Sequence, residues 1–151
     1  MVGILPRGPL WWGYCPDTWG WVALGHRKDT RHYEVKALYK ELRSQGARLY
    51  TSDYVLDELV TLLIRREAFE EAVRFIDGLF HAAEQGMLTI ERITSGRFAS
   101  TWVLRKRLQD KPRISFTDLT SMVLMKERGI QVVLTDDEHF EHVGMGFLKC
   151  P

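Results

Sequence analysis

The sequence predicts a three-layer α/β/α sandwich with a mostly parallel sheet. Short runs of β-type residues alternate with longer segments of helical periodicity along the chain. The links between these segments are short, which is typical of parallel strands joined by crossover helices. No internal repeat, low-complexity tract or linker divides the sequence, so we expect residues 1–151 to form a single domain.

The first third of the chain contains two predicted strands and two predicted helices. Residues 10–15 form an apolar strand, and residues 19–24 continue as a short helix. Apolar residues recur at helical spacing between residues 33 and 42, and this helix stops at Gly46. Residues 47–51 then form the second strand.

The middle of the chain predicts a helical hairpin followed by a strand. A helix capped by Ser52 or Asp53 runs to about Arg66, and a second amphipathic helix ends at Gly86. Residues 87–93 have the composition of a strand.

The last third predicts two long helices, two strands and a short helix. Residues 95–110 form a basic helix, and Pro112 separates it from a helix that starts at the SFTD motif and ends at Gly129. The remaining elements are a strand at 131–135, a short helix at 137–143 and a terminal strand at 145–149.

Composition fits a globular domain without an export signal. Hydrophobic residues make up 45% of the chain, and 21 basic residues nearly balance 20 acidic ones, so a polyanion would have to bind a local patch. Cys15 and Cys150 form neither a disulfide framework nor a zinc motif. The first 14 residues lack the apolar core of a signal peptide or membrane span. We therefore expect a cytoplasmic protein that does not enter a membrane.

Four acidic residues lie where an apolar run gives way to the start of a helix. They are Asp17, Glu58, Asp118 and Asp137. The carboxyl ends of neighbouring parallel strands face one crevice, where several carboxylates repel each other unless a cation neutralises them. Hard oxygen ligands favour Mg²⁺ or Mn²⁺, so we expect these acids to bind one of these ions.

Taken singly, each acid has a simpler explanation as a helix cap. Asp118 follows Ser115 by three residues, as in a capping box, but it also shares a helical stripe with Met122 and Met125. Asp17 and Asp137 suit N-cap positions. Glu58 lies at the edge of a buried stripe, whereas its neighbour Asp57 points to solvent. Caps need not converge in one place, so the combination favours a shared site.

Three segments resemble the PIN-domain family, and among its members the ribonuclease toxins of VapC type. They are DTWGWVALGHRKDTRHYEV near the start, TSDYVLDELVTLL in the middle, and SFTDLTSMVLMKERGIQVVLTDDEHFEHVGMGF at the end. The order of the segments matches the family, and together they cover most of the chain. The resemblance places the family's four metal-binding acids on Asp17, Glu58, Asp118 and Asp137.

The resemblance implies metal-dependent hydrolysis of RNA phosphodiesters, with Mg²⁺ or Mn²⁺ held by these acids. It also implies a small antitoxin that inserts an Arg or Lys into the acidic crevice, and a homodimer for which the helices between Tyr54 and Ala83 offer apolar surface. The family's T-x-D spacing assigns the inward position to Asp137. Asp136 is then a helix cap or an additional acceptor beside the metal.

Two residues depart from the family pattern. The family usually has an aliphatic residue before the first acid and a small hydroxyl residue two positions after it, where this chain has Pro16 and Trp19. Proline cannot donate a hydrogen bond within a central strand. The departures favour an alternative function, a non-catalytic PIN-like module that binds RNA or a partner protein. A weaker alternative is another Mg²⁺-dependent α/β phosphotransfer or hydrolase fold.

Other features have both a functional and a structural interpretation. His139 and His142 flank the predicted crevice and lack a third soft ligand for a transition metal. The basic residues of segment 105–113 either follow an RNA backbone or form a solvated helix face. The tryptophans at 11, 12, 19 and 21 suit the core or a protein interface better than base stacking.

Overall fold

The computed structural model describes residues 13–151, whose five strands form one sheet in the order β3-β2-β1-β4-β5. All four pairings are parallel, so the predicted sheet is confirmed and is more regular than expected. The strands are β1 (Gly13–Pro16), β2 (Arg48–Ser52), β3 (Leu88–Glu91), β4 (Val132–Leu134) and β5 (Leu148–Cys150).

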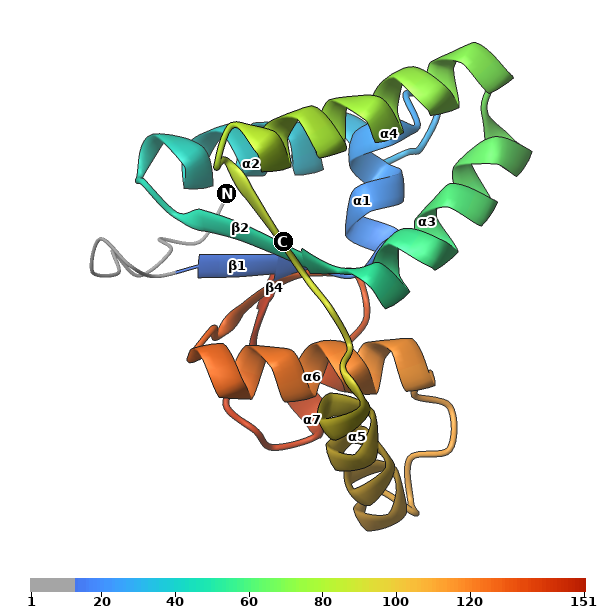
Figure 1. Ribbon diagram of the computed structural model, residues 1–151. Coiled ribbons are helices and arrows are strands. Elements are labelled where there is room, and N and C mark those ends of the chain that lie inside the picture. Colours follow the sequence, from blue (N-terminus) through green and yellow to red (C-terminus); the bar gives the residue numbers. More distant parts are fainter. Residues whose placement is uncertain (1–12) are drawn as a thin grey trace.

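Helices cover both faces of the sheet, as the three-layer prediction required (Figure 1). One face carries α1 (Thr18–Gly25), α2 (His32–Ser44), α3 (Asp53–Arg66) and α4 (Phe69–Glu84). The opposite face carries α5 (Ser95–Arg107), α6 (Phe116–Arg128) and α7 (His139–His142). No helix within residues 13–151 has the length and apolarity needed to cross a bilayer.

The strand order places a topological switch point at the centre of the sheet. From β1 the chain moves outward to β2 and β3, and it then crosses to the other side of β1 to form β4 and β5. Connections therefore leave β1 and β4 in opposite directions, which opens a crevice at their carboxyl ends. Pro16 is the register partner of Leu134, so both strands end at the same level.

The core divides into two layers because neighbouring strand residues point to opposite faces. Tyr14 packs in the cluster under α1–α4, whereas Cys15 packs with α5–α7. Trp21 is 1% exposed and belongs to the first cluster, so it fills the core as expected. Trp11, Trp12 and the predicted start of the first strand at residue 10 lie outside the described residues.

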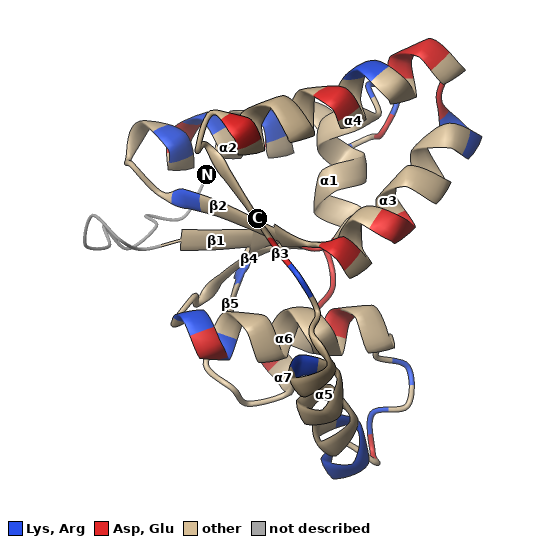
Figure 2. Cartoon of the chain, viewed as in Figure 1, with Lys and Arg blue, Asp and Glu red and all other residues tan. Residues whose placement is uncertain are grey.

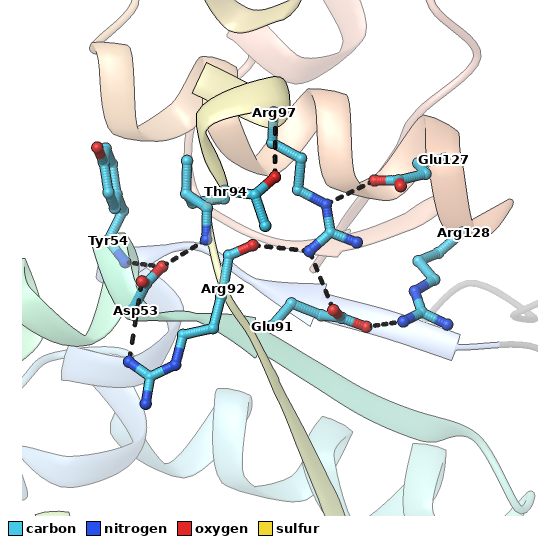
Figure 3. A network of polar contacts seen from close by, with 9 residues as sticks. Asp53, Tyr54, Glu91, Arg92, Thr94, Arg97, Glu127 and Arg128 are labelled. Atoms are coloured by element: carbon cyan, nitrogen blue, oxygen red, sulfur yellow. Dashed lines mark hydrogen bonds and ion pairs between the residues drawn. The ribbon is translucent and has the colours of Figure 1, made fainter. Parts of the chain in front are cut away.

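Polar contacts fix the crossover from the edge strand β3 to the opposite face (Figure 3). Glu91 pairs with Arg97 of α5 and with Arg128 of α6, and Arg97 also binds Glu127 at 2.7 Å. Because these ion pairs join β3 to two helices, they hold the edge strand against the α5–α6 layer. The partners of Glu127 and of Arg128 lie at least 30 positions away in the sequence, and no local pattern predicted any of the three pairs.

The helix ends settle two points that the sequence left open. Ser52 is the N-cap of α3, because its side chain accepts a hydrogen bond from the N–H of Val55. Asp53 instead accepts a hydrogen bond from the N–H of Ile93, which follows β3. In the basic segment, Arg105 donates hydrogen bonds to three carbonyl oxygens of the loop before α6, so this side chain holds the loop in place.

Gly20 allows α1 to lie directly on the ends of the central strands. A Cβ atom at this position would come within 2.4 Å of the Leu134 carbonyl oxygen and 3.2 Å of the Pro16 Cβ. The first of these contacts involves backbone, so it could not be relieved by a side-chain rotation. We expect Gly20→Ala to move α1 away from β4 and to lower the free energy of unfolding by about 1–3 kcal/mol.

Chemical denaturation tests this expectation against a matched control. Gly78 lies within α4, and a Cβ atom there would meet nothing within 4 Å. Gly78→Ala should therefore raise the free energy of unfolding by about 0.5–1 kcal/mol through helix propensity alone. Equal effects of the two substitutions would show that the close approach at Gly20 is unimportant.

Candidate active site

A pocket of about 660 Å³ lies at the carboxyl ends of β1 and β4. Figure 2 shows acidic segments at the starts of α3 and α6 and in the loop after β4 on this side of the sheet. All four acids that the sequence singled out line the pocket. The lining residues are Asp17, Thr18, Trp19, Glu58, Ser115, Asp118, Asp136, Asp137, Glu138, His139 and His142.

Asp17 lies deepest among the four acids and is 5% exposed. It is the N-cap of α1, where its Oδ1 accepts a hydrogen bond from the N–H of Gly20 at 2.8 Å. Its Oδ2 accepts a hydrogen bond from the Thr135 hydroxyl at 2.5 Å. The cap interpretation and the site interpretation therefore both describe Asp17, because the capping carboxylate also faces the pocket.

Thr135 connects two of the acids, although no role was predicted for its side chain. Its fully buried hydroxyl donates to Asp17 and accepts a hydrogen bond from the N–H of Asp137 at 2.9 Å. One side chain thus fixes the end of β1 relative to the loop after β4. The available sequence signal was the threonine of the T-x-D motif.

Glu58 and Asp118 enter the pocket from helices on opposite faces of the sheet. The Thr18 hydroxyl donates to Glu58 Oε2 at 2.7 Å, while Asp57 is exposed, as expected. Asp118 lies in the first turn of α6, and its N–H donates to the Oγ of Ser115, the N-cap. Met122 and Met125 on the same helix are fully buried, so the carboxylate of Asp118 borders an apolar stripe.

Burial and mutual repulsion raise the pKa values of two acids. The pKa of Asp17 is about 7, chiefly because of burial and further because of the charges of Asp118 and Asp137, against the hydrogen bonds from Thr135 and Gly20. The pKa of Asp118 is about 6, again chiefly through burial and then through Asp137 and Glu58. The pocket therefore favours any group that brings positive charge to it.

The adjacent acids of the loop after β4 have different surroundings. Asp137 Oδ1 accepts a hydrogen bond from the N–H of His139, and the Nδ1 of the same histidine lies 3.0 Å from this oxygen. Asp136 lies at the rim, is about half exposed and pairs with Arg31 at 2.7 Å. The Asp137 carboxylate is thus oriented by its own loop, whereas Asp136 binds a distant guanidinium.

The two departures from the expected pattern leave the four acids in one pocket. The N–H of Asp17 donates to Leu134 O in β4. Neighbouring residues of a strand direct their backbone groups to opposite sides, so the nitrogen of Pro16 faces β2. The β1–β2 register has already ended at Tyr14. Proline therefore costs no ladder hydrogen bond there. Trp19 lines the rim, and Thr18 supplies the hydroxyl that binds Glu58.

The donor chemistry of the pocket fits a hard divalent cation. Asp17, Glu58, Asp118 and Asp137 offer carboxylate oxygens, and the raised pKa values of Asp17 and Asp118 reflect uncompensated negative charge. Within residues 13–151, no three His, Cys, Asp or Glu side chains are already arranged around one point as a metal cage. Carboxylate oxygens of Asp17, Glu58 and Asp137 instead accept hydrogen bonds from neighbouring hydroxyl and N–H groups.

Known proteins share both the sequence pattern and the fold. Residues 14–145 match the model of the PIN domain family. The chain is 34% identical over 131 residues to the 23S rRNA-specific endonuclease VapC20 of Mycobacterium tuberculosis, covering 85% of this chain and 92% of that protein. The crystal structure of VapC20, described as a toxin that cleaves the sarcin–ricin loop, superposes with a TM-score of 0.74 at 31% identity, over 90% of this chain and 97% of that one.

More distant structures share the fold alone. DNA-bound VapBC from Salmonella typhimurium superposes with a TM-score of 0.67 at 16% identity, covering 91% of this chain and 96% of the matched chain. VapBC2 from Rickettsia felis, bound to a fragment of its promoter, gives a TM-score of 0.66 at 17% identity over similar shares.

The raised pKa values predict that the metal-free protein is more stable in acid. The folded-state values of about 7 and about 6 lie above the ordinary value of 3.8 for Asp. As pH rises from about 4 to about 7, the unfolded chain loses these protons first, so the free energy of unfolding falls through this window and stays lower above it. In a chelating buffer, we expect a higher melting temperature at about pH 5 than at about pH 8.

Asp118→Asn provides the control for this pH dependence. The amide keeps the shape of the side chain without its charge, so the variant should melt at a higher temperature than the native protein at about pH 8 and should differ less between the two pH values. If the variant and the native protein show the same pH dependence, folding does not raise the pKa of Asp118.

Proposed function

The chain belongs to the PIN domain family, and we propose that it is a metal-dependent endoribonuclease that acts as the toxin of a VapBC-type toxin–antitoxin pair. The observation that carries this proposal is the convergence of Asp17, Glu58, Asp118 and Asp137 in one pocket from four separate segments. Helix caps alone would give no reason for this convergence, whereas a shared cation would.

The four acids would hold Mg²⁺ or Mn²⁺. When bound, such an ion lowers the pKa of a water molecule and offsets the charge that develops on the phosphate and the leaving oxygen. Hydrogen bonds of Thr135 and Thr18 hold the Asp17 and Glu58 carboxylates in place before any substrate arrives. His139 orients Asp137 through its backbone N–H.

The proposed substrate is ribosomal RNA. VapC20 is described as specific for 23S rRNA and as cleaving the sarcin–ricin loop, and it shares about one third of its residues with this chain over nearly its full length. We therefore propose a structured loop of 23S rRNA as the first substrate to test. The two proteins share the fold, and the four acids of this chain line one pocket at the carboxyl ends of its central strands.

We further propose an antitoxin partner and a homodimer. The matched VapBC structures contain a second protein, and an antitoxin side chain with a positive charge would suit this acidic pocket. Exposed apolar residues lie on α3 and α4, the helices expected to dimerise. They are Val60, Ile64, Phe69, Val73 and Phe80.

Cleavage should require both the divalent ion and the inward-facing acids. We expect purified protein to cut a sarcin–ricin-loop RNA with Mg²⁺ or Mn²⁺ and to stop on chelation. Asp118→Asn and Asp137→Asn should each reduce the cleavage rate by about 100-fold or more, because each removes a charge needed for the ion. Gel analysis of end-labelled RNA measures the rates, and calorimetry measures Mn²⁺ binding.

Asp136→Asn is the matched control. Its side chain lies at the rim and pairs with Arg31, so the variant should retain most of the cleavage activity. Full activity of Asp137→Asn together with loss in Asp136→Asn would reverse this assignment. Absence of Mn²⁺ binding by the native protein would favour the non-catalytic module instead.

The homodimer proposal predicts a specific effect of the α4 stripe. Phe69, Val73 and Phe80 recur at helical spacing and are between 37% and 63% exposed. Phe69→Asp with Phe80→Asp should convert a dimer to a monomer at micromolar concentration, because it places charges in an apolar contact. Light scattering measures the mass, and a native protein that is already monomeric contradicts the proposal.

A further inference from the structure

Arg31 places a guanidinium group beside the acidic pocket. The residue precedes α2, and its side chain reaches Asp136, 105 positions later in the chain, with an Nη1–Oδ1 distance of 2.7 Å. Because Asp136 lines the pocket, this ion pair lies at the pocket rim. The local sequence around Arg31 gave no indication of this contact.

Two further contacts hold the guanidinium in a fixed position. Glu34 binds it as a fork, through Nε–Oε2 at 2.8 Å and Nη2–Oε1 at 2.9 Å. The Cζ atom of Arg31 also lies 5.5 Å from the ring centroid of Trp19, in cation–π geometry. The side chain is therefore ordered before a ligand binds, which lowers the entropic cost of using it.

The charge of the pocket makes a cation at this rim useful. The lining residues include six carboxylates and, within the described part of the chain, no Lys or Arg. A polyanionic strand approaching this pocket is repelled wherever the negative charge is not compensated. A guanidinium offers two N–H donors to a phosphate in a matching plane, which an ammonium group does not.

We propose that Arg31 binds a backbone phosphate of the RNA strand at the mouth of the pocket, and that Trp19 positions it there. This inference rests on the proposed ribonuclease function. The phosphate takes the place of Asp136, whose ion pair with Arg31 is about half exposed and therefore contributes little to stability. Glu34 and Trp19 keep their contacts while the exchange occurs.

The assignment gives Trp19 a role that a small hydroxyl residue could not perform. A flat aromatic face supports the guanidinium at one orientation, and Ser or Thr offers no such surface. The family departure at this position is thus a substrate-positioning feature of this chain. Trp19→Phe should preserve the contact in part, whereas Trp19→Leu should lose it.

The test measures RNA binding separately from cleavage. A fluorescein-labelled sarcin–ricin-loop hairpin and an unrelated single-stranded RNA of equal length are titrated with protein carrying Asp118→Asn, at salt concentrations between about 50 and 200 mM. Arg31→Ala should weaken binding of both RNAs by about tenfold at the lower salt concentration. The slope of log K against log salt should fall by about one.

Arg74→Ala is the matched control because Arg74 also pairs with a glutamate three positions away, at 2.9 Å, but both partners lie on α4 and neither lines the acidic pocket. It should leave both the affinity and the salt slope unchanged. Asp136→Asn should tighten RNA binding, since it removes the competing carboxylate. In protein with native Asp118, Arg31→Ala should raise KM and largely preserve kcat.

The outcomes separate this inference from the proposed function. If the native protein cleaves RNA and Arg31→Ala keeps the native affinity and salt slope, the role of Arg31 is wrong and the nuclease function stands. If the native protein binds RNA through Arg31 but never cleaves it with Mg²⁺ or Mn²⁺, the nuclease function is wrong and the phosphate contact stands. Circular dichroism melting of each variant identifies loss of folding, and Arg31→Lys, with its charge intact, should show an intermediate affinity.

Discussion

The hydrogen bond from the Thr135 hydroxyl to Asp17 is the interaction on which the arrangement of the site depends. It joins the ends of β1 and β4 at the point where the chain connections diverge, and the same hydroxyl receives the N–H of Asp137. Gly20 then brings α1 against Leu134 and donates its N–H to Asp17. The packing of α1 and the positions of Asp17 and Asp137 therefore depend on the same set of contacts.

This arrangement places charge where burial opposes it. Asp17 is almost fully buried, and its pKa is raised to about 7 although two hydrogen bonds favour its ionised form. A domain selected for stability alone would gain by replacing such a carboxylate with a neutral side chain. The two hydrophobic layers on either side of the sheet supply the stabilisation that offsets the cost of burying this carboxylate.

The sequence predicted the features that depend on local patterns. Periodicity and capping residues indicated the helices and strands, and the position of each acid after an apolar run indicated that Asp17, Glu58, Asp118 and Asp137 would meet. It could not predict contacts between residues that are distant in sequence. The bond between Arg31 and Asp136 spans 105 positions and depends on tertiary packing, which leaves no periodic signal. The bonds of Arg105 to loop carbonyls are local, but its basic neighbours suggested a solvated surface instead.

Pro16 and Trp19 illustrate how a departure from a family pattern depends on its surroundings. Judged from sequence, the two departures favoured a non-catalytic module, in part because proline cannot donate a ladder hydrogen bond in a central strand. The β1–β2 register ends before Pro16, while Asp17 continues the ladder to β4 through its own N–H. Trp19 in turn contacts Arg31 at the pocket rim. Both residues are therefore accommodated by structure outside the four acids, so a change at a motif position need not change the chemistry of the motif.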